Sequence, residues 1–147
     1  MLLANPEPWA TSVLLIDAND TVRAFYAKAL KQCSSDYVIL EAANGKSGLE
    51  LYRRSPRIDC VVLDLSLPGE SSFLLLTDLN PIASRPYVAV IVLTDLLMRG
   101  LGDLARKTGA FAVLVKKFTS GEDLDIAIQR AIAHVGALQK EDRPRAI

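Results

Sequence analysis

The amino-acid sequence predicts an α/β fold in which helices cover both faces of one parallel sheet. The first observation is a series of five short runs rich in Val, Ile and Leu, at 13–16, 38–40, 60–63, 88–93 and 113–115. Such runs are typical of strands that are buried on both faces of a parallel sheet. The second observation is that an amphipathic segment follows each run. Five β–α repeats joined by right-handed crossovers give a doubly wound sheet.

The segments after the runs carry apolar residues three or four positions apart, which is the period of an amphipathic helix. In chain order the stripes are Val22, Tyr26, Ala29, Leu30 and Cys33; Leu49 and Tyr52; 73–79; Leu97, Leu101 and Leu104 with Ala105; and Leu124, Ile128, Ala131, Ile132 and Val135. Asp20 is expected to cap the first helix, and Ser120 with Asp123 the last. Glu41 interrupts the second run, which indicates an edge strand. The pattern fits a flavodoxin-like (βα)5 fold with strand order 2-1-3-4-5.

The length of 147 residues corresponds to one domain. We expect an N-terminal extension at 1–10, the domain at 11–137 and a flexible C-terminal tail at 138–147, because the last segment is charged and aperiodic. Half of the residues are hydrophobic, which excludes a disordered chain. Cys33 and Cys60 fall inside apolar periodic segments, so both are expected to be small buried hydrophobes.

The charge balance and the apolar runs exclude several classes of protein. The 17 basic residues equal the 17 acidic residues in number, whereas a nucleic-acid-binding domain usually carries a basic excess. The longest apolar run, at 88–93, is far too short to cross a membrane. Residues 1–8 lack the basic and apolar regions of a signal peptide. We therefore expect a cytoplasmic protein that binds neither nucleic acid nor membrane directly.

Polar residues end four of the five predicted strands. Asp17, Asp64, Thr94 and Lys116 follow the first, third, fourth and fifth runs. In an open α/β sheet, ligands bind beyond the carboxyl ends of the strands, so these four side chains are expected to share one cleft. Each alone is more simply explained as a helix cap, a strand former or a solvated lysine. Together they predict a site in which paired carboxylates hold Mg²⁺ and in which Asp64 is a nucleophile that forms an aspartyl phosphate.

The segments around these residues resemble the response-regulator receiver domain. The matching segments are 14–17, 62–69, 92–94 and 115–116, and the middle one contains an Asp-x-x-x-Pro-Gly element that starts at Asp64. The spacing also fits, with 30 residues from Asp64 to Thr94 and 22 from Thr94 to Lys116. The resemblance extends over about residues 11–137.

The resemblance implies a role for each matching residue. Asp64 resembles the phosphoacceptor that receives a phosphoryl group from a histidine kinase or a phosphotransfer protein. Asp17, Asp64 and the backbone carbonyl of Ser66 resemble the ligands of Mg²⁺. Thr94 resembles the switch hydroxyl and Lys116 the lysine that pairs with the phosphate. Such a domain signals by protein–protein contact through its fourth helix, fifth strand and fifth helix, and it is not an enzyme because its phosphoryl chemistry is self-directed.

One departure from the family affects the predicted metal site. Family members usually carry a second acid directly after the first, and this position is Ala18. The missing carboxylate predicts weak Mg²⁺ binding. Asn19, Asp20 and Asp95 are candidates to compensate, although Asp20 is better explained as a helix cap.

Three further departures affect the predicted switch. Val113 stands where an aromatic residue is usual, and Lys117 stands where a proline would fix the backbone φ. Asp95 follows the switch threonine in place of a small residue and adds negative charge at the mouth of the site.

Two functions therefore stay open. The favoured one is a single-domain receiver that is phosphorylated on Asp64 and contacts a downstream protein target; the other is a degenerate receiver that binds partners without phosphorylation. A small enzyme or nucleotide binder is disfavoured, because no Gly-rich loop follows the first strand and His134 is the only histidine. A homodimer through the fourth and fifth helices, and a longer parent protein, are both open from the sequence.

Overall fold

The computed structural model describes residues 3–69, 71–96 and 98–141, so Leu97 of the predicted fourth stripe lies outside the described residues. The elements are β1 (Thr11–Ile16), α1 (Asp20–Cys33), β2 (Tyr37–Ala42), α2 (Gly45–Arg54), β3 (Cys60–Leu63), α3 (Ser72–Leu79), β4 (Ala89–Thr94), α4 (Leu101–Lys107), β5 (Ala112–Val115), a 3₁₀ turn (Lys116–Phe118) and α5 (Gly121–Glu141). The five strands form one parallel sheet in the order β2-β1-β3-β4-β5, which confirms the predicted fold. No helix in the described part of the chain is both long and apolar enough to span a bilayer.

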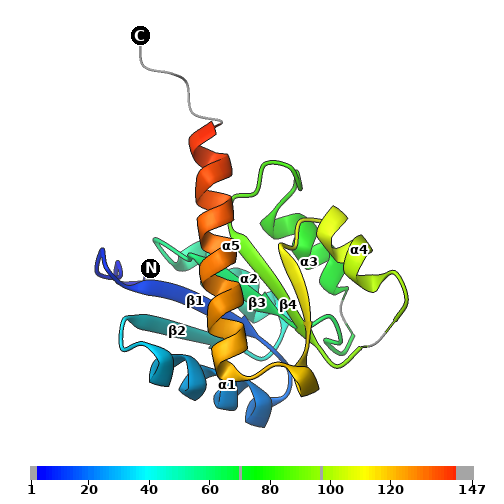
Figure 1. Cartoon of the computed structure of the whole chain (residues 1–147), viewed down its shortest axis with the longest axis horizontal. Coiled ribbons are helices and arrows are strands. Elements are labelled where there is room, and N and C mark those ends of the chain that lie inside the picture. The colour runs from blue at the N-terminus through cyan, green and yellow to red at the C-terminus, as the bar shows by residue number, and fades with distance from the viewer. Residues whose placement is uncertain (1–2, 70, 97, 142–147) are drawn as a thin grey trace.

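Helices cover both faces of the sheet, with α1 and α5 on one side and α2, α3 and α4 on the other (Figure 1). Alternate residues of β1 explain this arrangement, because successive side chains of a strand point to opposite faces. Val13 and Leu15 pack into the core beneath α1 and α5, whereas Leu14 and Ile16 pack into the core on the other face. The central strands β1, β3 and β4 are therefore apolar over most of their length, and their pairing holds their carboxyl ends in fixed register.

Strand β2 lies at the sheet edge, as the interruption at Glu41 predicts. Glu41 is exposed and pairs with Arg23 of α1, at 3.1 Å between Oε1 and Nε. The edge strand is thus connected by an ion pair to the helix that follows β1.

The cap of α1 differs from the prediction. Asn19, not Asp20, is the N-cap, and its Oδ1 accepts a hydrogen bond from the backbone N–H of Val22 at 3.0 Å. The capping side chain must belong to the last non-helical residue, and Asp20 already lies in the first turn, where its carboxylate pairs with Arg23.

The cap of α5 is the predicted pair. Ser120 Oγ accepts from the Asp123 N–H at 3.1 Å, and Asp123 Oδ2 accepts from the Ser120 N–H at 3.0 Å. These reciprocal bonds form a capping box that fixes where α5 begins.

Two other predictions need correction. Cys60 is buried as expected, but Cys33 is exposed because it is the last residue of α1 and lies where the helix ends. Helix α5 continues to Glu141, past the predicted domain end at 137, and Gln139 Nε2 donates to the carbonyl oxygens of Pro86 and Tyr87 at 3.3 and 3.1 Å. Residues 142–147 of the predicted tail lie outside the described residues.

Residues 3–10 precede β1 and contact the end of α2. The Leu3 N–H donates to the carbonyl oxygen of Arg54 at 3.0 Å. The Arg57 guanidinium donates to the carbonyl oxygens of Glu7 and Ala10. The described part of the predicted extension is therefore bonded to the domain, while residues 1–2 lie outside the described residues.

The buried side chain of Asn80 connects three segments near the amino ends of β4 and β5, at the end of the sheet opposite the predicted site. Its Nδ2 donates to the carbonyl oxygens of Val88 and Gly109, and its Oδ1 accepts from the N–H groups of Tyr87 and Val88. These bonds join the end of α3 to the residues before β4 and to the turn after α4.

A close contact between α1 and α5 gives a prediction about stability. A Cβ at Gly121 would lie 2.5 Å from the Cβ of Ala29, which cannot rotate away, whereas a Cβ at Gly136 of the same helix has no neighbour within 4 Å. We expect Gly121→Ala to lower the free energy of unfolding by about 1–3 kcal/mol. The matched Gly136→Ala should raise it by about 0.5–1 kcal/mol. Urea denaturation measures both changes, and two variants that shift in the same direction would contradict this explanation.

Candidate functional site

The two predicted carboxylates lie side by side at the carboxyl end of the sheet. Asp17 and Asp64 directly follow β1 and β3, which are neighbours in the sheet. The Asp64 N–H donates to the carbonyl oxygen of Ile16 at 3.1 Å, and the Asp17 N–H donates to that of Ala42 at 3.1 Å. These bonds continue the sheet pattern one residue past each strand. The sheet therefore fixes the backbone positions from which both carboxylate side chains extend.

Lys116 joins the two carboxylates. It follows β5, on the far side of β4 from β3, and its long side chain reaches back across the sheet edge. Its Nζ lies 2.7 Å from Asp17 Oδ2 and 2.8 Å from Asp64 Oδ2. All three side chains are buried, with exposed fractions of 10% or less. The predicted cluster thus exists as a buried cation held between two anions.

The second oxygen of each carboxylate is bonded within its own loop. Asp17 Oδ1 accepts from the Asn19 N–H at 2.8 Å. Asp64 Oδ1 accepts from the Ser66 N–H at 3.0 Å and from the Ser66 hydroxyl at 2.8 Å. Each carboxylate is therefore oriented by its loop through Oδ1, while Oδ2 faces the lysine.

The hydrogen bonds hold these groups in their charged forms. Burial opposes the ionisation of Asp64, but the hydrogen bonds from Lys116 and Ser66 outweigh it and hold the pKa of Asp64 below its ordinary value of 3.8. Burial also opposes the charge on Lys116, and the bonds to Asp17 and Asp64 reverse this effect and raise its pKa above 10.5. At neutral pH, the Asp64 carboxylate and the Lys116 ammonium therefore both carry their charges.

Thr94 is placed between these groups in the sheet without joining their ion pairs. It is fully buried at the end of β4, the strand that separates β3 from β5. Its Oγ1 accepts a hydrogen bond from the Leu96 N–H at 3.2 Å. The structure therefore brings Asp17, Asp64 and Lys116 into direct contact and places the Thr94 hydroxyl toward the loop that follows its own strand.

The oxygen donors at this site fit Mg²⁺ as a partial set. Asp17 and Asp64 supply two carboxylates, and Ser66, exposed in the loop after β3, supplies the predicted backbone carbonyl. Mg²⁺ is commonly bound through one or two carboxylates together with water and phosphate oxygens. Across residues 3–69, 71–96 and 98–141, no three His, Cys, Asp or Glu side chains are grouped as a metal cluster. Within that part of the chain, no third acid joins Asp17 and Asp64 in a metal-binding group.

The three candidates to compensate for Ala18 have other positions. Asn19 caps α1, and Asp20 is largely exposed and pairs with Arg23 at 2.8 Å. Asp95 is exposed after β4. Among the described residues, Asp17 and Asp64 are thus the two acids in contact with Lys116.

Arg23 is a contributor that the sequence did not indicate. Its Nη1 donates to the carbonyl oxygen of Asp17 at 2.6 Å, its Nη2 to Asp20 at 2.8 Å and its Nε to Glu41 at 3.1 Å. The three bonds fix the loop after β1 against α1 and β2. An Asp three residues before an Arg on one helix was the available signal, but the contact to Glu41 depends on the tertiary fold.

The two atypical residues near Lys116 differ in their surroundings. Val113 is half-buried and packs against the core under α2, α3 and α4. Lys117 is exposed, and its Nζ lies 5.0 Å from the centroid of the Phe118 ring. No cis peptide bond occurs among the described residues.

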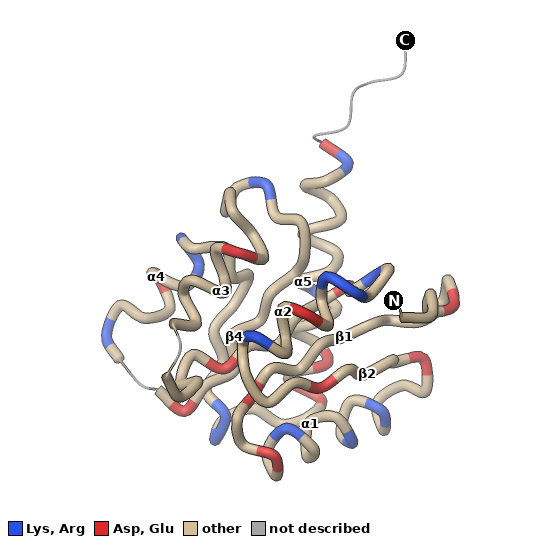
Figure 2. The backbone as a smooth tube through the Cα atoms, turned by 180° about the vertical axis from the view of Figure 1, so that it is seen from behind, with Lys and Arg blue, Asp and Glu red and all other residues tan. Residues whose placement is uncertain are grey.

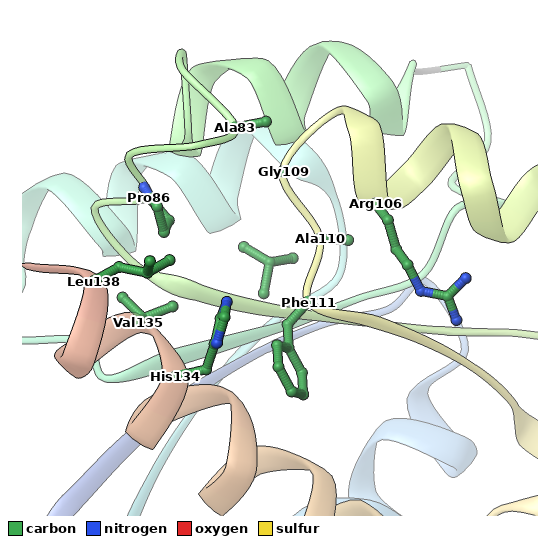
Figure 3. Close-up of a pocket in the computed structure, with 10 residues that line it drawn as sticks. Ala83, Pro86, Arg106, Gly109, Ala110, Phe111, His134, Val135 and Leu138 are labelled. Carbon is green, nitrogen blue, oxygen red and sulfur yellow. The ribbon is translucent and has the colours of Figure 1, made fainter.

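A cavity of about 250 Å³ lies outside this site and contains His134 (Figure 3). Its lining residues are Ala83, Pro86, Val90, Arg106, Gly109, Ala110, Phe111, His134, Val135 and Leu138. The His134 ring packs against Phe111, with 5.3 Å between ring centroids. The cavity lies between α5, the end of α4 and the segments before β4 and β5, and none of the predicted site residues lines it.

Comparison with known proteins agrees with the geometry. The family model for the response regulator receiver domain matches residues 13–129. Part of the sensor histidine kinase CheAY of Helicobacter pylori is 31% identical in an alignment of 127 positions that covers 82% of this chain and 15% of that protein. The transcriptional regulatory protein PdtaR of Mycobacterium tuberculosis is 31% identical over 121 residues, which are 82% of this chain and 56% of that protein. The chain thus spans little more than half, or less, of these relatives.

Solved structures show the same fold. A response regulator receiver domain protein from Clostridium thermocellum is 29% identical with a TM-score of 0.76, covering 87% of this chain and 98% of its own. A CheY-like receiver domain protein from Methanospirillum hungatei is 19% identical with a TM-score of 0.73, covering 90% of this chain and 98% of its own. The chain belongs to the response-regulator receiver domain family. It is therefore a signalling domain of two-component systems and not an enzyme in the usual sense.

The ion pairs of Asp64 give a pH-dependent prediction. Because the pKa of Asp64 is lower in the folded chain than in the unfolded chain, the unfolded chain binds more protons as the pH falls through this range. The stability that these bonds contribute is present above the ordinary value of 3.8 and is lost below it. We expect the free energy of unfolding to fall more steeply between pH 5 and about pH 2 in the wild type than in Asp64→Asn.

Urea denaturation at a series of pH values measures this difference. Asp103→Asn is the control, because Asp103 is exposed and lies 3.7 Å from Arg106 on the surface of α4. That variant should keep the wild-type slope, since exposed pairs contribute little. Parallel curves for the wild type and Asp64→Asn would show that the pKa of Asp64 is not lowered by folding.

Proposed function

We propose that this chain is a phosphorylatable receiver whose acceptor is Asp64. The observation that carries the proposal is the buried Nζ of Lys116, which contacts Asp64 and Asp17 at 2.8 and 2.7 Å. An ammonium beside an acceptor carboxylate can neutralise the oxygens of an incoming phosphoryl group. Thr94 at the end of the intervening strand supplies a hydroxyl at the same sheet edge.

The reaction transfers a phosphoryl group to a carboxylate oxygen of Asp64. That oxygen attacks the phosphorus of a phosphohistidine on a kinase or phosphotransfer protein, a P–O bond forms and the P–N bond breaks. The electron pair of the broken bond leaves with the histidine nitrogen. Attack of water on the phosphorus later releases inorganic phosphate and restores the carboxylate. Lys116 orients the attacking carboxylate before transfer and pairs with the phosphoryl oxygens afterwards.

Asp17, Asp64 and the Ser66 carbonyl would hold Mg²⁺ in this proposal. Bound there, Mg²⁺ would neutralise part of the negative charge that builds up on the phosphoryl oxygens. Both Oδ2 atoms already face Lys116, so the cation must share these carboxylates with the ammonium. With Ala18 beside Asp17, we propose weak metal binding.

The signal would pass to a downstream protein through α4, β5 and α5. All four residues of β5 are partly exposed, and Leu104 of α4 and Ile126 of α5 are about half exposed. A homodimer through α4 and α5 would use the same surface. Figure 2 shows the backbone from behind, where acidic and basic residues are spread over several elements.

The second candidate function is a degenerate receiver that binds its partners without phosphorylation. Ala18 favours it, because the described residues offer a pair of acids and no group of three. Val113 also favours it, since an aliphatic side chain has no ring to turn inward. The retained contact between Lys116 and Asp64 favours the phosphorylated receiver.

Incubation with Mg²⁺ and a small phosphodonor tests the acceptor directly. We expect intact mass spectrometry to show a gain of one phosphate on the wild type and no gain on Asp64→Asn. Asp78→Asn, on α3, is a matched control that should be modified like the wild type. If neither a small donor nor a cognate kinase modifies the wild type, the degenerate receiver is the correct function.

Ala18→Asp tests the cause of weak metal binding. A third carboxylate beside Asp17 adds attraction for a divalent cation, so we expect the Kd for Mg²⁺ to fall roughly tenfold or more. Isothermal titration calorimetry with Mg²⁺ measures this change in Kd. Ala43→Asp, in the loop after β2, is the control for added charge alone. An unchanged Kd in Ala18→Asp would mean that another group already fills the position.

A further inference from the structure

The hydrogen bonds that hold the turn of Lys116 are made by its buried residues and not by its exposed tip. The Thr119 N–H donates to the carbonyl oxygen of Lys116 at 3.1 Å, and the Thr119 hydroxyl donates to that of Val115 at 2.7 Å. Lys117 and Phe118 at the tip of the turn are exposed. Lys117 lacks the pyrrolidine ring by which a proline would fix the backbone angle φ at this position. The turn therefore depends on contacts with other elements.

Tyr26 of α1 supplies such contacts. Its hydroxyl lies 2.8 Å from the carbonyl oxygen of Thr119 and 3.2 Å from that of Lys116. One hydroxyl proton is thus shared by the two ends of the turn, with the shorter bond to Thr119. The Tyr26 side chain is buried, and its ring packs edge-on against Phe25 at 5.1 Å between centroids. Tyr26 also belongs to the core between the sheet and helices α1 and α5, which holds the hydroxyl in place.

The same tyrosine is adjacent to the acceptor site. Tyr26 lines a small pocket together with Asp17 and Asp64. Burial raises the pKa of Tyr26 above its ordinary value, so the hydroxyl stays protonated as a donor at neutral pH. The Lys116 backbone is therefore bonded to α1 through Tyr26, while the Lys116 ammonium is bonded to Asp17 and Asp64.

We propose that Tyr26 is a positioning residue for phosphoryl transfer, which holds the turn after β5 so that the Lys116 ammonium reaches Asp64. This inference rests on the proposed function. It assigns to a tyrosine on α1 the restraint that a proline at position 117 would otherwise supply. The carbonyl that Tyr26 contacts belongs to Lys116 itself, so loss of the hydroxyl frees the backbone from which the ammonium extends.

Tyr37 provides a matched control. It is also buried, and its hydroxyl donates to Asp125 and accepts from Gln129 at 2.9 Å. These partners lie on α5, and Tyr37 begins β2 at the opposite end of the strand from the loop that leads to the site. Tyr37→Phe and Tyr26→Phe therefore delete the same atom from a buried hydrogen bond, but only Tyr26→Phe affects the turn of Lys116.

The test compares both variants with the wild type in the presence of saturating Mg²⁺ and a series of phosphodonor concentrations. We expect Tyr26→Phe to lower the maximal phosphorylation rate roughly tenfold to 100-fold, because a small displacement of a reacting group is costly. The donor concentration at half-maximal rate should change little. Tyr37→Phe should keep the wild-type rate even where urea denaturation shows a comparable loss of stability. Equal rates for Tyr26→Phe and the wild type would overturn the proposal, as would an equal loss of rate in Tyr37→Phe.

Amide hydrogen exchange provides a readout that does not require phosphorylation. The Thr119 N–H bonds to the Lys116 carbonyl, so we expect its exchange to accelerate in Tyr26→Phe and not in Tyr37→Phe. A wild-type chain that accepts no phosphate would overturn the proposed function, and the Thr119 exchange rate would then still decide whether Tyr26 holds the turn. Unchanged exchange in Tyr26→Phe would show that the turn does not depend on the hydroxyl.

Discussion

The pairing of one buried ammonium with two buried carboxylates is the constraint on which the site depends. Lys116 lies within 2.8 Å of Asp17 and Asp64, and all three side chains are nearly inaccessible to water. Charges in such surroundings must be paired, because an isolated buried charge costs several kcal/mol. The parallel sheet makes the pairing possible by ending β1, β3 and β5 at one edge. The fold thus positions Asp64, and the lysine holds its carboxylate ionised.

The surrounding bonds fix the three backbone segments from which these charges extend. Arg23 bonds the carbonyl of Asp17 to α1 and β2, Ser66 orients Asp64 from the loop after β3, and Tyr26 bonds the turn of Lys116. Each restraint acts on a different loop at the same sheet edge. Helix α1 contributes two of the three, so its position decides the geometry of two of the three charges.

Local patterns predicted the sheet and the strand-end residues because both depend on short-range features. Continuous apolar runs indicated strands, and strand order then placed Asp17, Asp64, Thr94 and Lys116 at one edge. The predicted N-cap of α1 is wrong by one residue, because Asn and Asp are both good N-cap residues and only the backbone conformation distinguishes Asn19 from Asp20. The apolar stripe of the first helix indicates only that the Tyr26 ring belongs to the core. Its hydroxyl bonds to residues about ninety positions away, which no local pattern can indicate.

The absence of an acid at position 18 has two opposing electrostatic effects. It removes a carboxylate that would attract Mg²⁺, so it weakens the metal site. It also removes a negative charge that would repel the phosphoryl group, which carries close to two negative charges at neutral pH. The unphosphorylated cluster of Asp17, Asp64 and Lys116 has one net negative charge, and with a third acid it would have two. In the proposed function, phosphorylation of Asp64 would start from a cluster with one negative charge fewer, although the exposed Asp95 adds a negative charge close enough to act on Tyr26. The ammonium of Lys116 would then be the cation in direct contact with Asp64 that neutralises the phosphoryl oxygens, so the position of the turn that carries it matters for the transfer.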